Sequence, residues 1–219
     1  MLSLIGWLDG LTALTVVIIG LTFGLLSFYK SVKLEAKLLG VTGLATISVG
    51  FNLLGPAVDF LVIIFTGDNL EPYWLYALLI YAWSAPITIF GRYLGVELIL
   101  PNKKWIIVGI YAVLSIIFEV LLFYYFLTNP SLIFLFPEDP NGEALLNTSI
   151  FTTSPVFILM LIFLIFGLIF KGFGFLNKSF QSSGELKRKF LYLSLVWILF
   201  IVCGELDGLF DPGVGIIFH

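Results

Sequence analysis

One carboxyl group, Glu119, lies deep inside an apolar segment of the sequence. It follows Lys104, where that segment begins, by 15 residues, which is about 22 Å along a helix that must cross about 30 Å of hydrocarbon. Tyr111, Ser115 and Glu119 recur every four residues and therefore share one face of a helix. An ionisable group inside a bilayer costs about 2.5–3.5 kcal/mol on insertion scales. We therefore expect this polar stripe to face the interior of a helix bundle.

Two interpretations of the stripe stay open. In the functional one, Glu119 contacts a ligand or takes part in proton or cation coupling. In the structural one, desolvation keeps the carboxyl neutral, and it joins two helices through Ser or Tyr hydroxyls. Either way, Glu119 is expected near Ser115 and a polar group of another span.

A second group of oxygen donors surrounds Pro56. This proline cannot donate a hydrogen bond to the carbonyl of Asn52 and predicts a kink there. Asn52, Pro56 and Asp59 share one helix face, so a freed carbonyl, an amide and a carboxylate form a possible cation site, suited to sodium, calcium or a proton. The alternative is an outer helix end with Asp59 in water.

Pro86 predicts another kink, midway along a different apolar segment. It frees the carbonyl of Ala82 and opens space for a pocket or a hinge, although membrane helices also tolerate such prolines. Arg92, further along, is expected at the inner interface, where its guanidinium reaches lipid phosphates or Glu97. Gly20 and Gly24 form a small-residue pair suited to close helix packing, within the bundle or between subunits.

The remaining chemistry is sparse. Glu205, Asp207 and Asp211 form an outer acidic rim exposed to water. The single histidine, His219, is the last residue, and the single cysteine is Cys203. Zinc hydrolases and Ser–His proteases need histidines within the spans, so we expect no metal site, no cofactor and no enzyme activity. Nothing indicates nucleic-acid binding.

The composition requires lipid as the main solvent and partner. Of 219 residues, 60% are hydrophobic and 11% are charged, whereas soluble domains carry roughly 25% charge. Six segments are long enough to cross a bilayer as helices, which predicts an all-α membrane helix bundle, a single transmembrane helical domain over residues 1–219. The predicted spans are residues 7–29, 34–55, 73–94, 104–127, 150–169 and 190–206.

Basic residues predict how the chain is threaded. All 11 lysines and arginines lie in three stretches, at residues 30–37, 92–104 and 171–189. Short loops rich in Lys and Arg resist translocation, so these connections are expected in the cytoplasm of a cell-membrane protein whose amino terminus lies outside. Asp211-Pro212 resembles a helix start, and a seventh helix is therefore possible from residue 212, with a short outer tail as the alternative.

This architecture resembles the seven-helix membrane sensor modules that precede histidine kinases in archaea and bacteria. The resemblance lies in the outside amino terminus, the short connections, the lysine clusters and the possible seventh span. It implies a sensory or receptor-like module with a cytoplasmic signalling partner. Two other hypotheses remain, a small cation- or proton-coupled transporter or channel, and a structural subunit of a membrane complex. A homo-oligomer is also possible.

Overall fold

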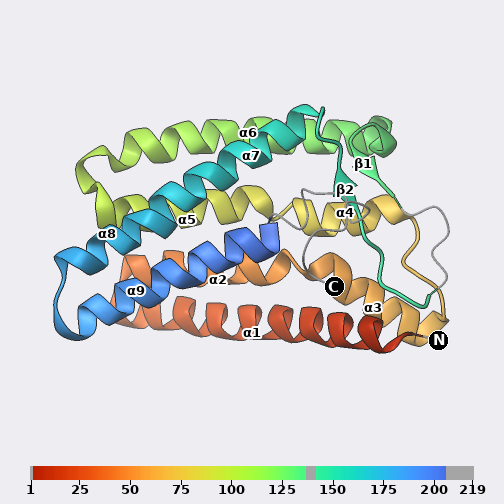
Figure 1. Cartoon of the computed structure of the whole chain (residues 1–219), viewed down its shortest axis with the longest axis horizontal. Helices are drawn as coiled ribbons and strands as arrows, with labels where there is room; N and C mark the ends of the chain where they lie inside the picture. Colours follow the sequence, from red (N-terminus) through yellow and green to blue (C-terminus); the bar gives the residue numbers. More distant parts are fainter. Residues whose placement is uncertain (1, 137–141, 206–219) are drawn as a thin grey trace.

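The computed structural model describes residues 2–136 and 142–205, with side chains described up to residue 202. Within these residues the fold is all-α, apart from two strands of two residues each (Figure 1). The α-helices are α1 (Leu4–Leu34), α2 (Lys37–Phe51), α3 (Leu54–Thr66), α4 (Tyr73–Tyr81), α5 (Ser84–Ile99), α6 (Lys104–Thr128), α7 (Pro155–Gly167), α8 (Gly174–Gln181) and α9 (Gly184–Leu199). Shorter elements are the 3₁₀ turns η1 (Pro101–Lys103) and η2 (Pro130–Leu132), the π-helices η3 (Leu168–Phe173) and η4 (Phe200–Glu205), and the antiparallel strands β1 (Phe134–Leu135) and β2 (Ser149–Ile150).

Several helices have the length and composition of membrane spans. In the described part of the chain, four helical segments qualify, and a fifth does so when the bent pair α2–α3 is taken as one span. Large apolar side chains are exposed along them, such as Ile106, Ile116 and Val120 on α6. Such exposure suits lipid rather than water. The structure therefore confirms the all-α class and indicates a membrane protein with several spans.

The spans differ from the six predicted from sequence. α1 and α6 are unbroken and cover 7–29 and 104–127. The segment 34–55 breaks after Phe51 and continues as α3 with a bend of 46°. The segment 73–94 consists of α4 and α5 and extends to Ile99.

The last two predicted spans also shift. The segment 150–169 becomes helical only at Pro155, because Ile150 pairs with Phe134 in the strands and Ser154 caps the helix. It then continues through η3 and α8 to Gln181. The segment 190–206 corresponds to α9 and η4, and α9 alone has 16 residues. A seventh helix from residue 212 lies outside the described residues.

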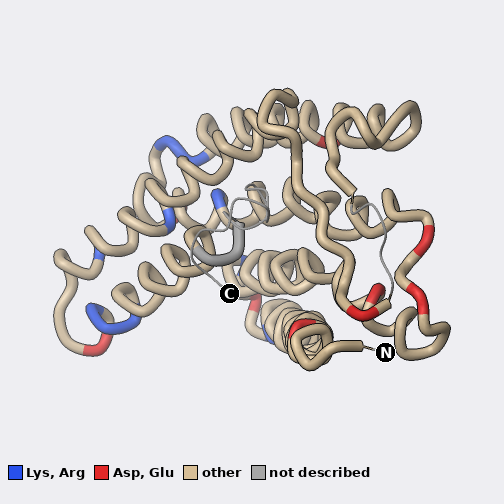
Figure 2. The backbone as a smooth tube through the Cα atoms, turned by 45° about the vertical axis from the view of Figure 1, so that its right-hand side comes forward, with Lys and Arg blue, Asp and Glu red and all other residues tan. Residues whose placement is uncertain are grey.

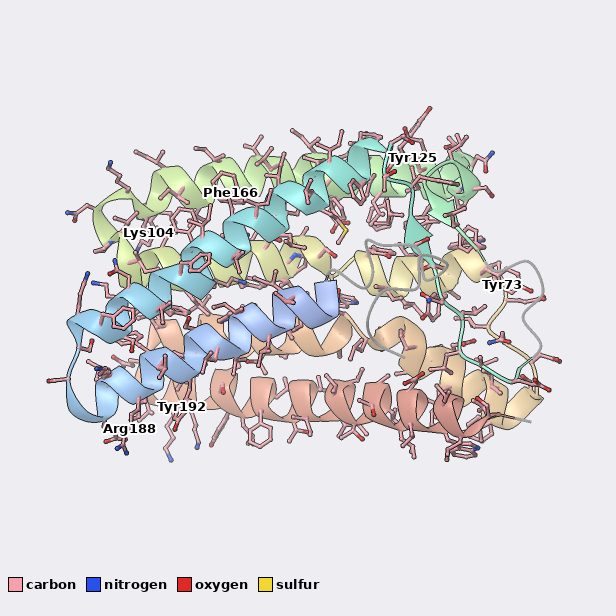
Figure 3. The ribbon with its side chains drawn as sticks, viewed as in Figure 1. Tyr73, Lys104, Tyr125, Phe166, Arg188 and Tyr192 are labelled. Carbon is pink, nitrogen blue, oxygen red and sulfur yellow. The ribbon has the colours of Figure 1, made fainter. Side chains whose placement is uncertain are left out.

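Charged residues divide the bundle into two ends (Figure 2). The turns between α1 and α2, α5 and α6, and α8 and α9 form the basic end. Most of the described acidic residues lie toward the opposite end, near the connection from α3 to α4, which we call the acidic end. Figure 3 shows Lys104 and Arg188 at the former and Tyr73 and Tyr125 at the latter. Which end faces the cytoplasm remains the prediction made from the basic residues.

Two packing features hold the bundle. α1 and α2 approach closely along their glycines, since a Cβ at Gly20 would lie 2.8 Å from Gly50 Cα, and one at Gly24 would lie 2.8 Å from Gly43 O. The small-residue pair of α1 thus packs within the bundle. α5 is the central helix, which contacts α2, α6, α7, η3 and α8. Residues on α5 are consequently positioned by most of the fold.

Candidate functional site

Two helices are interrupted in the same way. Pro56 is the third residue of α3 and Pro86 is the third residue of α5, and each follows a break of two residues in its span. Proline lacks the N–H that would bond to the carbonyl four residues earlier, at Asn52 or Ala82. The next amide restores the helix in both cases, with hydrogen bonds from Ala57 N to Leu53 O at 3.1 Å and from Ile87 N to Trp83 O at 3.0 Å.

The two breaks lie at the same depth. α2 has 15 residues and α5 has 16 between the basic end and the break, which is about 22–24 Å of helix in each. α2 and α5 also pack against each other. The breaks are therefore neighbours inside the bundle.

A cavity of about 160 Å³ lies between these breaks. It is lined by residues from both broken helices, from α7 and from the segment before β2, namely Asn52, Leu53, Pro56, Tyr76, Ile80, Tyr81, Ser84, Ile87, Thr88, Asn147, Thr148, Met160 and Phe163. The polar groups among them are amides and hydroxyls, and none of these lining side chains carries a charge. The Oγ1 of Thr148 is buried and has no hydrogen-bond partner among the described residues, while the residue is 5% exposed.

The wall of the cavity at the acidic end is held by a buried carboxylate, Asp59. This residue is 0% exposed. Its Oδ1 accepts a hydrogen bond from Leu70 N at 2.7 Å, and its Oδ2 accepts one from Leu146 N at 2.7 Å. Asn69 Nδ2 donates to Oδ2 at 3.1 Å. We call Asp59, Asn69, Leu70 and Leu146 the Asp59 clasp.

The clasp extends to the neighbouring backbone. Asn69 Nδ2 also donates to Ala144 O at 2.9 Å, and Asn69 Oδ1 accepts from Gly142 N at 2.8 Å. Leu146 directly precedes Asn147 and Thr148, which line the cavity. Tyr81 adds a hydrogen bond from its hydroxyl to Thr148 O at 3.3 Å. The clasp thus fixes the segment that closes the cavity.

Asp59 therefore differs from both sequence interpretations. It is not in water, because the connection from α3 to α4 and the segment 142–146 fold over it. Its two oxygens are already occupied by N–H donors, which leaves little room for a cation ligand. Asn52 and Pro56 line the cavity, whereas Asp59 is not among the lining residues.

Arg92 lies in the bundle interior rather than at the inner interface. It is 2% exposed, its Nη2 donates to Phe163 O, and its guanidinium lies 4.9 Å from the centre of the Tyr111 ring. The prediction was wrong because α5 continues to Ile99, which puts Arg92 about 10 Å inside the end of the helix. Glu97, its expected partner, instead forms an ion pair with Lys104 at 2.5 Å.

A second basic residue, Lys171, is buried close to Arg92 along α5. It is 4% exposed, and its Nζ lies 3.6 Å from the centre of the Trp197 ring. Glycine at position 91 makes room for it, because a Cβ there would collide with Nζ. Lys171 belongs to the π-helix η3 and not to the predicted connection 171–189, and π-helical turns are frequent at functional sites.

The polar stripe of α6 is only partly enclosed. Tyr111 and Ser115 are 4% and 1% exposed, and Glu119 is half-buried. Neither Ser115 Oγ nor Glu119 Oε1 has a hydrogen-bond partner among the described residues. Among the described residues, no polar group of another span forms a hydrogen bond with Glu119 Oε1. The side chain of Glu205 and all of Asp207 and Asp211, the predicted acidic rim, lie outside the described residues.

Comparisons with known proteins add no constraint: no protein-family model, no curated protein and no solved structure matches the chain. The candidate site consequently rests on the geometry alone. Among the described residues no cluster of three potential metal ligands is present.

Sequence reasoning identified Asn52 and the two kinks but missed Ser84, Thr88, Tyr81 and Thr148. The hydroxyl spacing of Ser84 and Thr88 one turn apart, next to Pro86, was the signal available.

Proposed function

We propose that the chain is a multi-pass membrane protein that binds a small uncharged polar solute in the cavity between its two broken helices. The observation that carries this proposal is the cavity itself, where two interruptions at equal depth meet. Interrupted helices in corresponding positions point to substrate sites in membrane transporters. Irregular backbone at such depth is tolerated where it lines a cavity.

The size and lining of the cavity define the solute. A cavity of about 150 Å³ can hold a molecule of the size of benzene, so 160 Å³ suits a small molecule of that size or less. Burying an unpaired charge is far more costly than burying a hydrogen-bonded polar group. Amide and hydroxyl groups without charged side chains in the lining therefore favour a small polyol or amide over an ion.

Two uses of the site can be distinguished. Transport is favoured by the paired interruptions, because each break can act as a hinge between two helix halves. A receptor-like module, the hypothesis that the sequence favoured, is supported by a different feature. α5 runs without a further break from Ser84 and Thr88 at the cavity to the Glu97–Lys104 ion pair at the basic end, so it connects the site to that surface.

The test uses the purified chain in lipid, with glycerol and urea as probes. Thr88→Leu adds an apolar side chain to the cavity wall, and we expect it to weaken probe binding at least tenfold. Thr42→Leu is the matched control, since Thr42 is exposed and its hydroxyl donates to the Leu38 carbonyl of its own helix. Binding that is equal in both variants, or absent from the unmodified chain, would contradict the proposal.

A measurement of glycerol flux then distinguishes transport from receptor-like binding. Vesicles that contain the chain are exposed to a glycerol gradient, and their swelling is followed by light scattering. Faster swelling than in empty vesicles, slowed by Thr88→Leu but not by Thr42→Leu, supports transport. Binding without flux supports the receptor-like alternative.

A further inference from the structure

Away from the cavity, α6 carries two buried polar atoms that bond to nothing among the described residues. Ser115 is 1% exposed and its Oγ has no partner. Glu119 follows one turn later on the same face, and its Oε1 is also buried without a partner. Buried polar groups are nearly always hydrogen-bonded, so each exception needs an explanation.

Among the described residues, Glu119 forms no ion pair with the elements packed against α6, which are α5, α7, η1 and η2, together with α4 and β1 through Phe126. The titratable residues of α4 are tyrosines, and β1 has none. α7 and η2 contain no titratable side chain. The titratable residues of α5 and η1 are Arg92, Tyr93, Glu97 and Lys103. The titratable residues of α5 contact the half of α6 nearer the basic end. Arg92 lies over the Tyr111 ring, and Tyr93 contacts Trp105. Glu97 forms an ion pair with Lys104. Lys103 directly precedes α6 at that end.

Along α6, the contact of Arg92 with Tyr111 is the one nearest to Glu119. Tyr111 precedes Glu119 by eight residues, which is about 12 Å along the helix. On α4, Tyr81 reaches the same apolar core, but its hydroxyl donates to Thr148 O. Among the described residues, no cation pairs with Glu119 and no donor bonds its buried Oε1. An ionised carboxylate there would be a costly state in the apolar layer, and neutralisation avoids it.

We propose that Glu119 and Ser115 form a proton-binding site in the membrane. The carboxylate of Glu119 takes up one proton and becomes a neutral carboxylic acid, whose O–H can donate to Ser115 Oγ one turn away. Glu119 lies nine residues before the end of α6 at Thr128, about 14 Å from the acidic end. The proton is exchanged with that side of the membrane. The site is independent of solute binding in the cavity, because neither residue lines it.

Infrared spectroscopy of the reconstituted chain tests the protonation state. A neutral carboxylic acid has a carbonyl stretch that an ionised carboxylate lacks. We expect this band at pH 7 in the unmodified chain, and its loss in Glu119→Gln. Glu185→Gln is the matched control, because Glu185 is exposed and paired with Lys189, and it should leave the band intact. A band that is absent at pH 7, or that persists in Glu119→Gln, would overturn the proposal.

Two further measurements address exchange and the role of Ser115. Raising the external pH should remove the band reversibly, and a band that is insensitive to strongly alkaline pH would mean a fixed structural acid. Ser115→Ala should shift the band, because the acid loses its hydrogen-bond acceptor. An unchanged band would exclude Ser115 from the site.

A chemical test requires no variant. A membrane-soluble carbodiimide reacts with protonated carboxyls in the apolar phase, so it should modify Glu119 at least tenfold faster than the exposed Glu185. Modification of Glu185 alone would contradict the proposal. Solute binding measured on the same samples keeps the two proposals separate, since Glu119→Gln should leave glycerol binding unchanged.

Discussion

Asp59 and Glu119 are carboxyl groups with opposite surroundings in the bundle. Asp59, near the acidic end, is 0% exposed and accepts hydrogen bonds from Leu70 N, Leu146 N and Asn69 Nδ2. Glu119, on α6, is half-buried and its enclosed Oε1 accepts none among the described residues. Both are single acidic residues in apolar sequence, yet one is fully bonded and the other is not.

The difference in hydrogen bonding indicates different roles for the two carboxyl groups. The hydrogen bonds to Asp59 join two segments of the chain, the connection from α3 to α4 and the segment before β2. Such a group has no spare capacity for a ligand. A carboxyl group that accepts no hydrogen bond is not stabilised in its charged form. It can therefore bind and release a proton. On this reasoning Asp59 should matter for folding and Glu119 for function.

The largest expected effect is that of Asp59→Asn. The substitution keeps the shape but turns an acceptor into an NH₂ group that faces backbone N–H donors. Hydrogen bonds to charged groups contribute about 1.5–3 kcal/mol each, so we expect a loss of roughly 2–4 kcal/mol in the free energy of unfolding. Thermal unfolding in lipid nanodiscs measures it.

Asp68→Asn is the control for that experiment. Asp68 is exposed in the same connection between α3 and α4, and its carboxylate forms no ion pair or hydrogen bond among the described residues. It should change stability by less than about 0.5 kcal/mol, as surface substitutions usually do. Equal effects of the two variants would remove the distinction between Asp59 and an ordinary surface acid.

Asn69→Ala should have the next largest effect. It removes the side chain that bonds Asp59, Ala144 O and Gly142 N, but leaves the two backbone donors to Asp59 in place. We expect a loss of about 1.5–3 kcal/mol. In a double-mutant cycle with Asp59→Asn, residues of one network couple by about 0.5–3 kcal/mol. Additive effects would show that the clasp does not act as a unit.

The sequence revealed the local features of this contrast but not the distant ones. Apolar length and the two prolines predicted the membrane helices and their interruptions, because both depend on residues a few positions apart. The partners of Asp59 are 10, 11 and 87 residues away, and no local pattern encodes them. Arg92 was misplaced for a related reason. The end of α5 depends on its packing and its turn into α6, and that end decides whether a basic side chain reaches the surface or the interior.

The cavity lining shows the same limit of prediction from the sequence. Asn52 and Pro56 were identified because they lie next to the interruption that they help to form. Thr148 comes from an irregular segment whose position is set by the clasp. The sequence therefore predicted the lining residues next to the Pro56 interruption and left out the part that closes the cavity.

The smallest expected effect on stability is that of Glu119→Gln. Because Oε1 has no hydrogen-bond donor to lose, a neutral amide of the same size should change the free energy of unfolding by less than about 0.5 kcal/mol. Glu119→Leu should be neutral or stabilising, since it replaces a polar group in an apolar layer. Both variants are unfolded in nanodiscs beside Asp59→Asn. A loss of more than about 2 kcal/mol in Glu119→Gln would give Glu119 the same structural role as Asp59, and the contrast between the two carboxyl groups would then fail.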